Sequence, residues 1–357
     1  MPPASAPSAP VRIAIVGTGT MAHRHARAFQ AQGPNCAVVA AVDVVPERVE
    51  AYCREFAIPR AFGSVEQMLA QCDCQAVAIV TPDAWHAPLS IQCLQAGRHV
   101  LCEKPLALHH AQAQEMVEAA RVAGTINLVN LSYRNWSALQ GVAAAVRAGQ
   151  IGEVRHVEAS YLQCWLSSRI WGDWRTSPRW LWRLSRAHGS NGVLGDIGVH
   201  IVDFATFPAG EITEIFCRLQ TFEKAPQNRV GEYVLDANDS AVMTVTFANG
   251  ALGTIHTTRW ASGHADRLYL KISGTLGAVE IDSERATNTF RLCAGPGLDT
   301  AEWREVEVAP TPSNYERFVA SILTGQPDQP DFARGAEVQR MLDACFASHE
   351  AGHPVRL

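Results

Sequence analysis

The N-terminal third of the chain alternates short β-branched runs with longer segments whose apolar residues recur at helical spacing. This alternation is typical of a parallel sheet wound with helices, because each strand needs a crossover before the next parallel strand. The predicted strands cover residues 12–16, 38–43, 76–80, 99–102 and 126–130. The predicted helices cover residues 21–32, 46–56, 65–70, 87–96 and 111–123. The pattern therefore predicts a doubly wound α/β domain over residues 11–132.

The pattern changes after residue 132. A connecting helix is predicted at residues 139–149, and residues 151–161 show the alternation of a strand with one solvated face. Further strands are predicted at residues 211–221, 241–247, 251–257, 268–273 and 278–281. This predicts a second α/β domain over residues 133–357 with an open, largely antiparallel sheet. Two closing helices, near residues 315–324 and 333–349, have no strand partners and are expected to pack back onto one of the domains.

Composition adds limits on class and location. The 357 residues are 47% hydrophobic and 18% charged with a formal net charge of −5, which is typical of a globular protein and gives no nucleic-acid signature. Ten cysteines show no disulfide or zinc spacing, so we expect reduced thiols, with Cys72 and Cys74 in a surface loop. Residues 1–10 lack the regions of a signal peptide and are predicted to be a disordered leader. No apolar run approaches the roughly 20 residues that span a bilayer, and we expect a cytoplasmic protein with no membrane partner.

A glycine-rich motif lies between the first predicted strand and the first predicted helix. The sequence IAIVGTGTMA has the spacing GxGxxA, which lets the backbone approach a pyrophosphate at a helix N-terminus. The following strand ends at Asp43, 24 residues after Gly19, as expected for a Rossmann domain. The alternative is a structural glycine turn with no ligand. We assign cofactor binding here to Gly17, Thr18, Gly19, Thr20, Met21 and Ala22.

Asp43 also bears on the choice of cofactor. A carboxylate at this position suits the hydroxyls of the adenosine ribose and repels a 2′-phosphate, so NAD(H) is favoured over NADP(H). Arg48, one turn into the next helix, is positioned to reach a 2′-phosphate, which leaves NADP(H) open; the alternative is a solvated helix face.

Two further motifs follow predicted strands of the same sheet. TPDAWH spans residues 81–86, and CEKPLAL spans residues 102–108. Ligands of doubly wound sheets bind beyond the carboxyl ends of the strands, so both loops are expected to open onto the cofactor crevice. We assign cofactor contacts in these loops to Thr81, Pro82, His86, Glu103 and Lys104.

Taken in order, GTGTMA, TPDAWH, CEKPLAL and GDIGVHIVD make the chain similar to the Gfo/Idh/MocA family of NAD(P)-dependent oxidoreductases. The likeness covers roughly residues 11–349. It implies a Rossmann domain followed by an α/β domain whose open sheet often forms an oligomer interface, here in a homodimer or homotetramer. It also implies oxidation or reduction of a carbinol carbon on sugars, cyclitols and similar polyols. The family pattern places the catalytic residues at Lys104, Asp196 and His200.

The chemistry asks for the same residue types. Hydride removal from an alcohol also requires loss of the hydroxyl proton, for which His200 is a suitable base. Asp196 lies four residues earlier, on the same face of a helix, and can orient the imidazole or hold a substrate hydroxyl. Lys104 would keep the histidine neutral and stabilise the alkoxide, while Asp203 is expected to pair structurally. Two alternatives are a core histidine with Asp196 as helix N-cap, and a zinc site at Asp196, His200 and Asp203; we assign no metal.

The segment of residues 163–192, here called the Trp/Arg segment, holds five tryptophans and five arginines with Asp173 as its only acid. Indole faces suit the C–H faces of sugars, and guanidinium groups suit carboxylates or vicinal hydroxyls, so we assign substrate binding to Trp174 and Trp182. The alternative is an oligomer contact or a packed loop. Substrate binding is also assigned to Tyr133 and Arg134, and to the three catalytic residues.

The leading hypothesis is therefore an NAD(H)-dependent dehydrogenase or reductase for a sugar, cyclitol, polyol or sugar acid. An NAD-dependent glycoside hydrolase of the same family would use transient oxidation and release no net NADH. A non-catalytic dinucleotide-binding regulator would bind the nucleotide without turnover, and the joint presence of Lys104, Asp196 and His200 argues against it.

Overall fold

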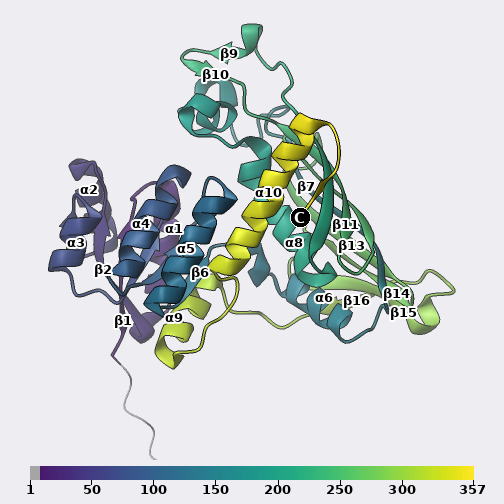
Figure 1. The fold of residues 1–357 in the computed structure, drawn as a ribbon, viewed down its shortest axis with the longest axis horizontal. Helices are drawn as coiled ribbons and strands as arrows, with labels where there is room; N and C mark the ends of the chain where they lie inside the picture. The colour runs from purple at the N-terminus through teal and green to yellow at the C-terminus, as the bar shows by residue number, and fades with distance from the viewer. Residues whose placement is uncertain (1–8) are drawn as a thin grey trace, which may run out of the picture. The chain divides into compact units, whose positions relative to one another are not determined.

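The computed structural model describes residues 9–357 (Figure 1). Most of the predicted leader, residues 1–8, lies outside the described residues, and residues 9 and 10 have no regular secondary structure. The chain divides into two compact units. The first unit comprises the chain up to residue 132 together with residues 312–337, and the second comprises residues 133–311 and 338–357.

The first unit is built on a six-stranded parallel sheet with the strand order β3-β2-β1-β4-β5-β6. Its strands are β1 (Val11–Val16), β2 (Cys36–Val42), β3 (Ala61–Phe62), β4 (Ala76–Ile79), β5 (His99–Cys102) and β6 (Asn127–Val129). Its helices are α1 (Thr20–Gln30), α2 (Pro46–Phe56), α3 (Val65–Gln71), α4 (His86–Gln95), α5 (His110–Ala123) and α9 (Asn314–Thr324). The predicted strands and helices are confirmed with small shifts at their ends, and only the two-residue β3 was missed.

Local sequence explains several boundaries of these helices. Pro46 occupies the first turn of α2, where a missing backbone N–H costs nothing. Ser313 forms a capping box with Glu316 at the start of α9, and Gly124 ends α5 in the left-handed conformation. Helices α1, α2 and α9 contribute to one buried cluster with β1, in which Ile13 and Ile15 take part. The sheet order reverses beside β1, so the crevice for a ligand lies at the carboxyl ends of β1 and β4.

The second unit contains a nine-stranded sheet with the order β16-β15-β14-β13-β7-β12-β11-β8-β17. All neighbouring strands are antiparallel except β7 and β12, which run parallel. Its strands are β7 (Val154–Gln163), β8 (Ile212–Gln220), β11 (Ser240–Phe247), β12 (Leu252–Thr258), β13 (Asp266–Gly274), β14 (Gly277–Asp282), β15 (Thr289–Ala294), β16 (Arg304–Glu307) and β17 (Val355–Arg356). A separate hairpin pairs β9 (Arg229–Val230) with β10 (Tyr233–Val234). The prediction of an open, largely antiparallel sheet is confirmed.

One face of this large sheet is covered by helices. Helices α6 (Ser137–Arg147) and α8 (Val199–Ala209) pack against it, and α10 (Phe332–Ala351), from Val338 onward, belongs to the same unit (Figure 1). Burial alternates along β11 because only one face of the sheet packs against helices. Met243 and Val245 are buried, whereas Val242, which points to the opposite face, is 52% exposed. In Figure 1, no helix of residues 9–357 covers the other face of this sheet.

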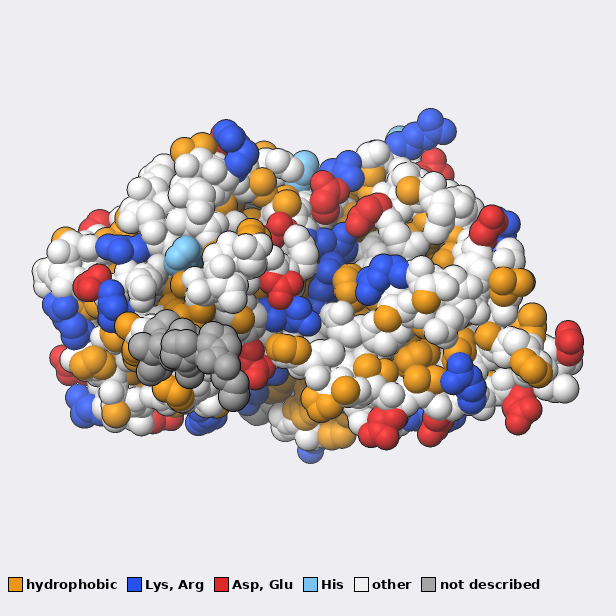
Figure 2. All heavy atoms as spheres, turned by 90° about the horizontal axis from the view of Figure 1, so that it is seen from below, with side chains coloured by type: hydrophobic (Ala, Val, Ile, Leu, Met, Phe, Trp, Pro, Cys, Tyr) orange, Lys and Arg blue, Asp and Glu red, His pale blue; other side chains and the backbone are white. Residues whose placement is uncertain are grey.

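The cysteines and the surface complete the description. All ten cysteines lie in the described residues, and all are free and buried. The prediction of a surface loop for Cys72 and Cys74 is wrong in its exposure, because both thiols pack inside the first unit. Within residues 9–357, no helix combines the length and the apolar character needed to cross a membrane. On the face drawn in Figure 2, acidic and basic side chains are interspersed with apolar ones.

Candidate active site

The glycine-rich loop joins β1 to α1 and has the geometry of a phosphate cradle. Gly17 has a φ of +89°, and a Cβ there would lie 2.6 Å from the carbonyl oxygen of Val80 at the end of β4, so only glycine fits. Gly19 is the N-cap of α1 and has no side-chain cap, and a Cβ at this position would meet nothing within 4 Å. The first turn of α1 thus faces open space, which fits the pyrophosphate of a dinucleotide.

Asp43, directly after β2, is tied to this loop. Its Oδ2 accepts hydrogen bonds from the backbone N–H of Thr18 at 2.9 Å and from the Thr18 hydroxyl at 2.7 Å, and its Oδ1 accepts one from the N–H of Val45 at 3.0 Å. Burial raises the pKa of Asp43, but these hydrogen bonds and the Arg48 guanidinium, 3.8 Å away, together lower it below its usual value. Asp43 is therefore a fixed negative charge beside the cradle.

The other residues predicted for the cradle differ in exposure. Thr18 and Ala22 are buried, so their side chains shape the loop from inside. Thr20 and Met21 are exposed at the start of α1, and Pro82 is exposed after β4. The side chain of Arg48 is 56% exposed.

His86 binds the two predicted cofactor loops of the first unit to each other. Its Nδ1 lies 2.7 Å from the carbonyl oxygen of Pro105, and its Nε2 lies 2.9 Å from that of Thr81. A carbonyl oxygen only accepts hydrogen bonds, so both ring nitrogens must carry hydrogen and the ring is an imidazolium. Burial by itself lowers the pKa of His86, but the surrounding acceptors and the nearby Cys102 and Asp83 raise it to about 10. His86 is buried, so its ring joins the two loops from inside the first unit.

Glu103 anchors the loop that carries Lys104. Its Oε1 accepts hydrogen bonds from His25 Nε2 and from Asn130 Nδ2, each at 2.7 Å, and its Oε2 accepts one from the backbone N–H of Lys104 at 3.2 Å. Burial raises the pKa of Glu103, and the His25, Asn130 and Lys104 interactions outweigh it and lower the pKa to about 2. Asn130 also bonds to Tyr315 of α9. Sequence reasoning missed His25, although it lies one turn beyond the glycine motif.

Lys104 follows β5, is half-buried, and is joined to Pro105 by a cis peptide bond. It belongs to the first unit, whereas Asp196 and His200 belong to the second. The first unit therefore determines the position of Lys104, and the second unit determines the positions of Asp196 and His200.

The segment containing Asp196 and His200 is not one regular α-helix. Residues Leu194–Gly198 form a π-helical turn, and α8 begins after it at Val199. The prediction that Asp196 and His200 share the face of a single α-helix is therefore wrong in its helix type. Asp196 lies in the π turn and His200 in α8, and a π turn has more residues per turn than an α-helix. Single π turns inside helices are frequent at functional sites.

Asp196 is held by two arginines. Its Oδ2 accepts a hydrogen bond from Arg259 Nη2 at 2.9 Å and lies 3.6 Å from Arg183 Nε. The Asp196 side chain is 27% exposed, whereas that of Arg259 is fully buried. Arg259 lies 63 residues after Asp196 and was not identified from the sequence.

His200, in the first turn of α8, packs against an aromatic pair of residues through Tyr133. Its ring centroid lies 4.7 Å from that of Tyr133 in an edge-on arrangement. The Tyr133 hydroxyl lies 2.6 Å from the Tyr161 hydroxyl. Burial, together with Tyr133 and Asp266, raises the pKa of Tyr161 well above its usual value, so Tyr161 stays neutral. His200, Tyr133 and Tyr161 therefore form one linked cluster at the start of α8.

Arg134 and Asp203 form a buried bidentate pair. Arg134 Nε and Nη2 donate to the two carboxylate oxygens of Asp203 at 2.9 and 2.6 Å, and the guanidinium lies 4.2 Å from the ring centroid of Phe207. The expected structural pairing of Asp203 is confirmed. Arg134 is 6% exposed and its guanidinium is engaged in this pair, so its contact with substrate stays a prediction.

The Trp/Arg segment folds around an apolar cluster that it completes with Leu235. Trp174 is 1% exposed and donates from Nε1 to the carbonyl oxygen of Leu166, so it supports the segment from inside. Trp182 is 37% exposed, and the Arg183 guanidinium lies 4.5 Å from its ring centroid. Of the two tryptophans predicted to bind substrate, only Trp182 presents its indole to the surface. The cluster contains Trp165, Leu166, Trp174, Leu181, Leu184 and Leu235.

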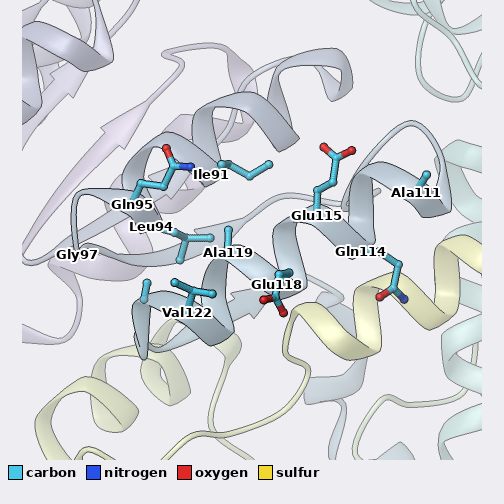
Figure 3. Close-up of a pocket in the computed structure, with 11 residues that line it drawn as sticks. Ile91, Leu94, Gln95, Gly97, Ala111, Gln114, Glu115, Glu118, Ala119 and Val122 are labelled. Carbon is cyan, nitrogen blue, oxygen red and sulfur yellow. The ribbon is translucent and has the colours of Figure 1, made fainter.

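A groove of about 850 Å³ lies elsewhere, between α4 and α5 (Figure 3). Its walls are helix faces lined by Leu94, Ala119 and Val122 together with the carboxylates of Glu115 and Glu118. It includes none of the residues of the glycine loop, TPDAWH or the EKP motif. No three histidine, cysteine, aspartate or glutamate side chains of residues 9–357 form a group that could hold a metal ion.

The doubly wound sheet, the glycine cradle and Asp43 define a dinucleotide-binding domain. Residues 11–131 match the family described as "Oxidoreductase family, NAD-binding Rossmann fold", and residues 139–280 match the "GFO/IDH/MocA C-terminal domain". The protein is an NAD-binding oxidoreductase. It belongs to the GFO/IDH/MocA family, as the sequence motifs predicted.

Its relatives include enzymes named for sugars and cyclitols. Levoglucosan dehydrogenase of Pseudarthrobacter phenanthrenivorans is 27% identical over 384 residues, covering 95% of this chain and 96% of the relative. Inositol 2-dehydrogenase of Rubrobacter xylanophilus is 27% identical over 351 residues, covering 97% and 93%. The solved structure of levoglucosan dehydrogenase with NADH and L-sorbose has a TM-score of 0.86 and 25% identity, covering 98% of this chain and 99% of that one.

Proposed function

We propose that the protein is an NAD(H)-dependent dehydrogenase or reductase that acts on a carbinol carbon of a sugar, cyclitol, polyol or sugar acid. The observation that carries this proposal is the cluster at the start of α8, where a partly exposed Asp196 is held by Arg259 and His200 follows one turn later. A carboxylate and a histidine of this kind supply a hydrogen-bond acceptor and a base for an alcohol substrate.

His200, Asp196 and Lys104 have separate roles toward the substrate. A nicotinamide dinucleotide held by the glycine loop and Asp43 would supply the hydride-accepting chemistry in the oxidation direction. The hydroxyl proton passes to His200, and Asp196 holds a neighbouring hydroxyl. Lys104 stabilises the developing charge on the substrate oxygen. Glu103 and His86 position the loop that carries Lys104.

The substrate class rests on the relatives and on the aromatic surface. Named relatives act on levoglucosan and inositol, and another is a D-glucoside 3-dehydrogenase of Escherichia coli. Trp182, with Arg183 beside it, offers an indole face and a guanidinium to a ring with several hydroxyls. Tyr133 is the further candidate contact, because it packs against His200.

We also propose that the uncovered face of the nine-stranded sheet joins copies of the chain in a homodimer or homotetramer. Val242, on that face, is 52% exposed, and Leu252 of the neighbouring strand β12 is 60% exposed. Exposed apolar side chains on a broad sheet face are typical of an interface. Light scattering after size exclusion should give a multiple of the 38.8 kDa chain mass, and a monomer would contradict the proposal.

The experiment that tests the activity is a panel of sugars, cyclitols, polyols and sugar acids incubated with NAD⁺. Formation of NADH in proportion to oxidised product is the expected result. Cleavage of a glycoside without net NADH would identify a hydrolase instead. Nucleotide binding with no turnover on any substrate class would identify a non-catalytic regulator.

A further inference from the structure

Arg259 lies immediately after β12, and its side chain is fully buried. Its Nη2 donates to Asp196 at 2.9 Å, and its Nη1 donates to the backbone carbonyl of Arg183 at 2.9 Å. The guanidinium also lies 5.0 Å from the ring centroid of Trp165. One buried arginine thus links the end of a sheet strand, the Trp/Arg segment and the acid of the π turn that precedes α8.

Burying this charge is costly. A buried ion pair is often no more stable than well-packed apolar residues of the same volume, so stability alone is a weak reason for an arginine here. Asp196 and the buried Asp239, which also pairs with Lys224 at 3.0 Å, favour the charged form of Arg259, whereas Arg183 adds a second positive charge that disfavours it. The Nε of Arg259 is buried and has no hydrogen-bond partner among the described residues.

The exposure of the two partners differs in an informative way. The Asp196 side chain is 27% exposed, whereas that of Arg259 is 0% exposed. A substrate can therefore reach the carboxylate but not the guanidinium. Whatever Arg259 contributes to the reaction must pass through Asp196 or through the segment that Arg183 belongs to.

We propose that Arg259 is a positioning residue for the reaction, which fixes the orientation of the Asp196 carboxylate so that it accepts a hydrogen bond from a substrate hydroxyl. A guanidinium suits this task because its planar donors reach Asp196 and the Arg183 carbonyl at once. The proposal rests on the proposed function, in which Asp196 holds substrate.

The test compares Arg259→Met and Arg259→Lys with a matched control, Arg267→Met. Arg267 also forms a bidentate pair in the same sheet, with Asp282 at 3.0 and 2.7 Å, but it has no contact with Asp196. We expect Arg259→Met to lower kcat/KM by about 10- to 100-fold, the range for a small misplacement of a reacting group. Arg259→Lys keeps the positive charge but loses the planar arrangement of donors. Its kcat/KM should lie between that of Arg259→Met and that of the wild type. Arg267→Met should leave kcat/KM unchanged, and NADH affinity should be unchanged in all three.

Two readouts separate positioning from a merely structural role. The double variant Asp196→Asn/Arg259→Met should lose no more kcat/KM than Asp196→Asn alone, because residues acting through one group are not additive. The acidic limb of the pH profile of kcat/KM should move to higher pH in Arg259→Met, since loss of a nearby cation raises the pKa of neighbouring acids and bases. Arg267→Met should leave the profile in place.

The outcomes are distinct. If the two losses multiply in the double variant and the pH profile stays in place, Arg259 is only structural and the proposal is overturned. If Asp196→Asn retains wild-type kcat/KM, the role of Asp196 in the proposed function fails, and the Arg259 proposal fails with it. Should Arg259→Met not fold, Arg259→Lys decides: a folded lysine variant with wild-type kcat/KM and pH profile overturns the proposal.

Discussion

Glu103 and His25 form a buried hydrogen bond of 2.7 Å that connects the loop of Lys104 to the helix that begins at the glycine cradle. The two residues are 78 positions apart in the chain. Through this contact, the element that would hold the pyrophosphate and the element that carries the lysine are fixed to each other within one unit. Neither residue has to touch a ligand to affect how both loops are held.

The ionisation of Glu103 should make stability depend on pH. Its folded pKa is about 2, below the ordinary value of 4.5, so its contribution to the free energy of unfolding is present above pH 4.5 and is lost as pH falls through about 2. Glu103→Gln should therefore be less stable than the wild type near neutrality, with the difference shrinking in acid. Urea unfolding across a pH series measures this. A difference that is independent of pH would show that the carboxylate charge plays no part.

His86 should give the opposite dependence. Its folded pKa of about 10 lies above the ordinary 6.5, so its contribution to stability is complete below pH 6.5 and is lost as pH rises through about 10. His86→Gln should lower the free energy of unfolding most at mildly acidic pH and least in alkali. His353→Gln, at an exposed histidine of the second unit, serves as the control. Equal effects of His86→Gln at both ends of the range would contradict an imidazolium at this position.

Asp43 should determine the cofactor preference. Because a carboxylate held beside the cradle repels a 2′-phosphate, NADH should bind at least about 10-fold more tightly than NADPH. Asp43→Ala should reduce this ratio, and Arg48→Ala should weaken NADPH binding more than NADH binding. Fluorescence titration of both nucleotides provides the affinities. Equal or tighter binding of NADPH by the wild type would contradict this prediction and indicate that Arg48, rather than Asp43, determines the cofactor preference.

Lys104 and His200 should behave as one catalytic unit. His200→Ala should lower kcat by about 10²- to 10⁴-fold, the range for loss of a general base, with little change in NADH binding. Lys104→Ala should be comparably damaging, and the double variant should lose far less than the product of the two effects. Steady-state kinetics on an identified substrate, with circular dichroism to verify folding, test this. Near-normal turnover of either folded single variant would remove that residue from the mechanism.

Trp182 and Trp174 should differ in what they control. Trp182→Ala should raise KM and leave stability nearly unchanged, since its indole is 37% exposed. Trp174→Ala should instead destabilise the fold by about 3–5 kcal/mol, the usual cost of removing a buried tryptophan. Thermal unfolding and substrate saturation curves separate the two. If Trp182→Ala leaves KM unchanged but dissociates an oligomer, the segment is an interface.

The sequence by itself determined most of the elements and the order of the motifs. Hydrophobic periodicity is a local property, so it was enough to predict the parallel sheet, the second open sheet and both closing helices. The glycine spacing and Asp43 also predicted the cofactor cradle, because a tight turn and a helix start are encoded within a few residues. The two-residue strands β3 and β17 were missed because so short a strand leaves no periodic pattern, and the edge strands β15 and β16 of the second sheet were missed as well.

Only the tertiary structure decided which charges meet. Asp196 pairs with Arg259 across 63 residues and Arg134 with Asp203 across 69, and periodicity carries no information over such separations. The π turn at Leu194–Gly198 and the burial of Trp174 also depend on how the segment packs. The sequence named the residue types of the site, and long-range packing decided which of them a substrate can reach, because burial and pairing are properties of the folded chain.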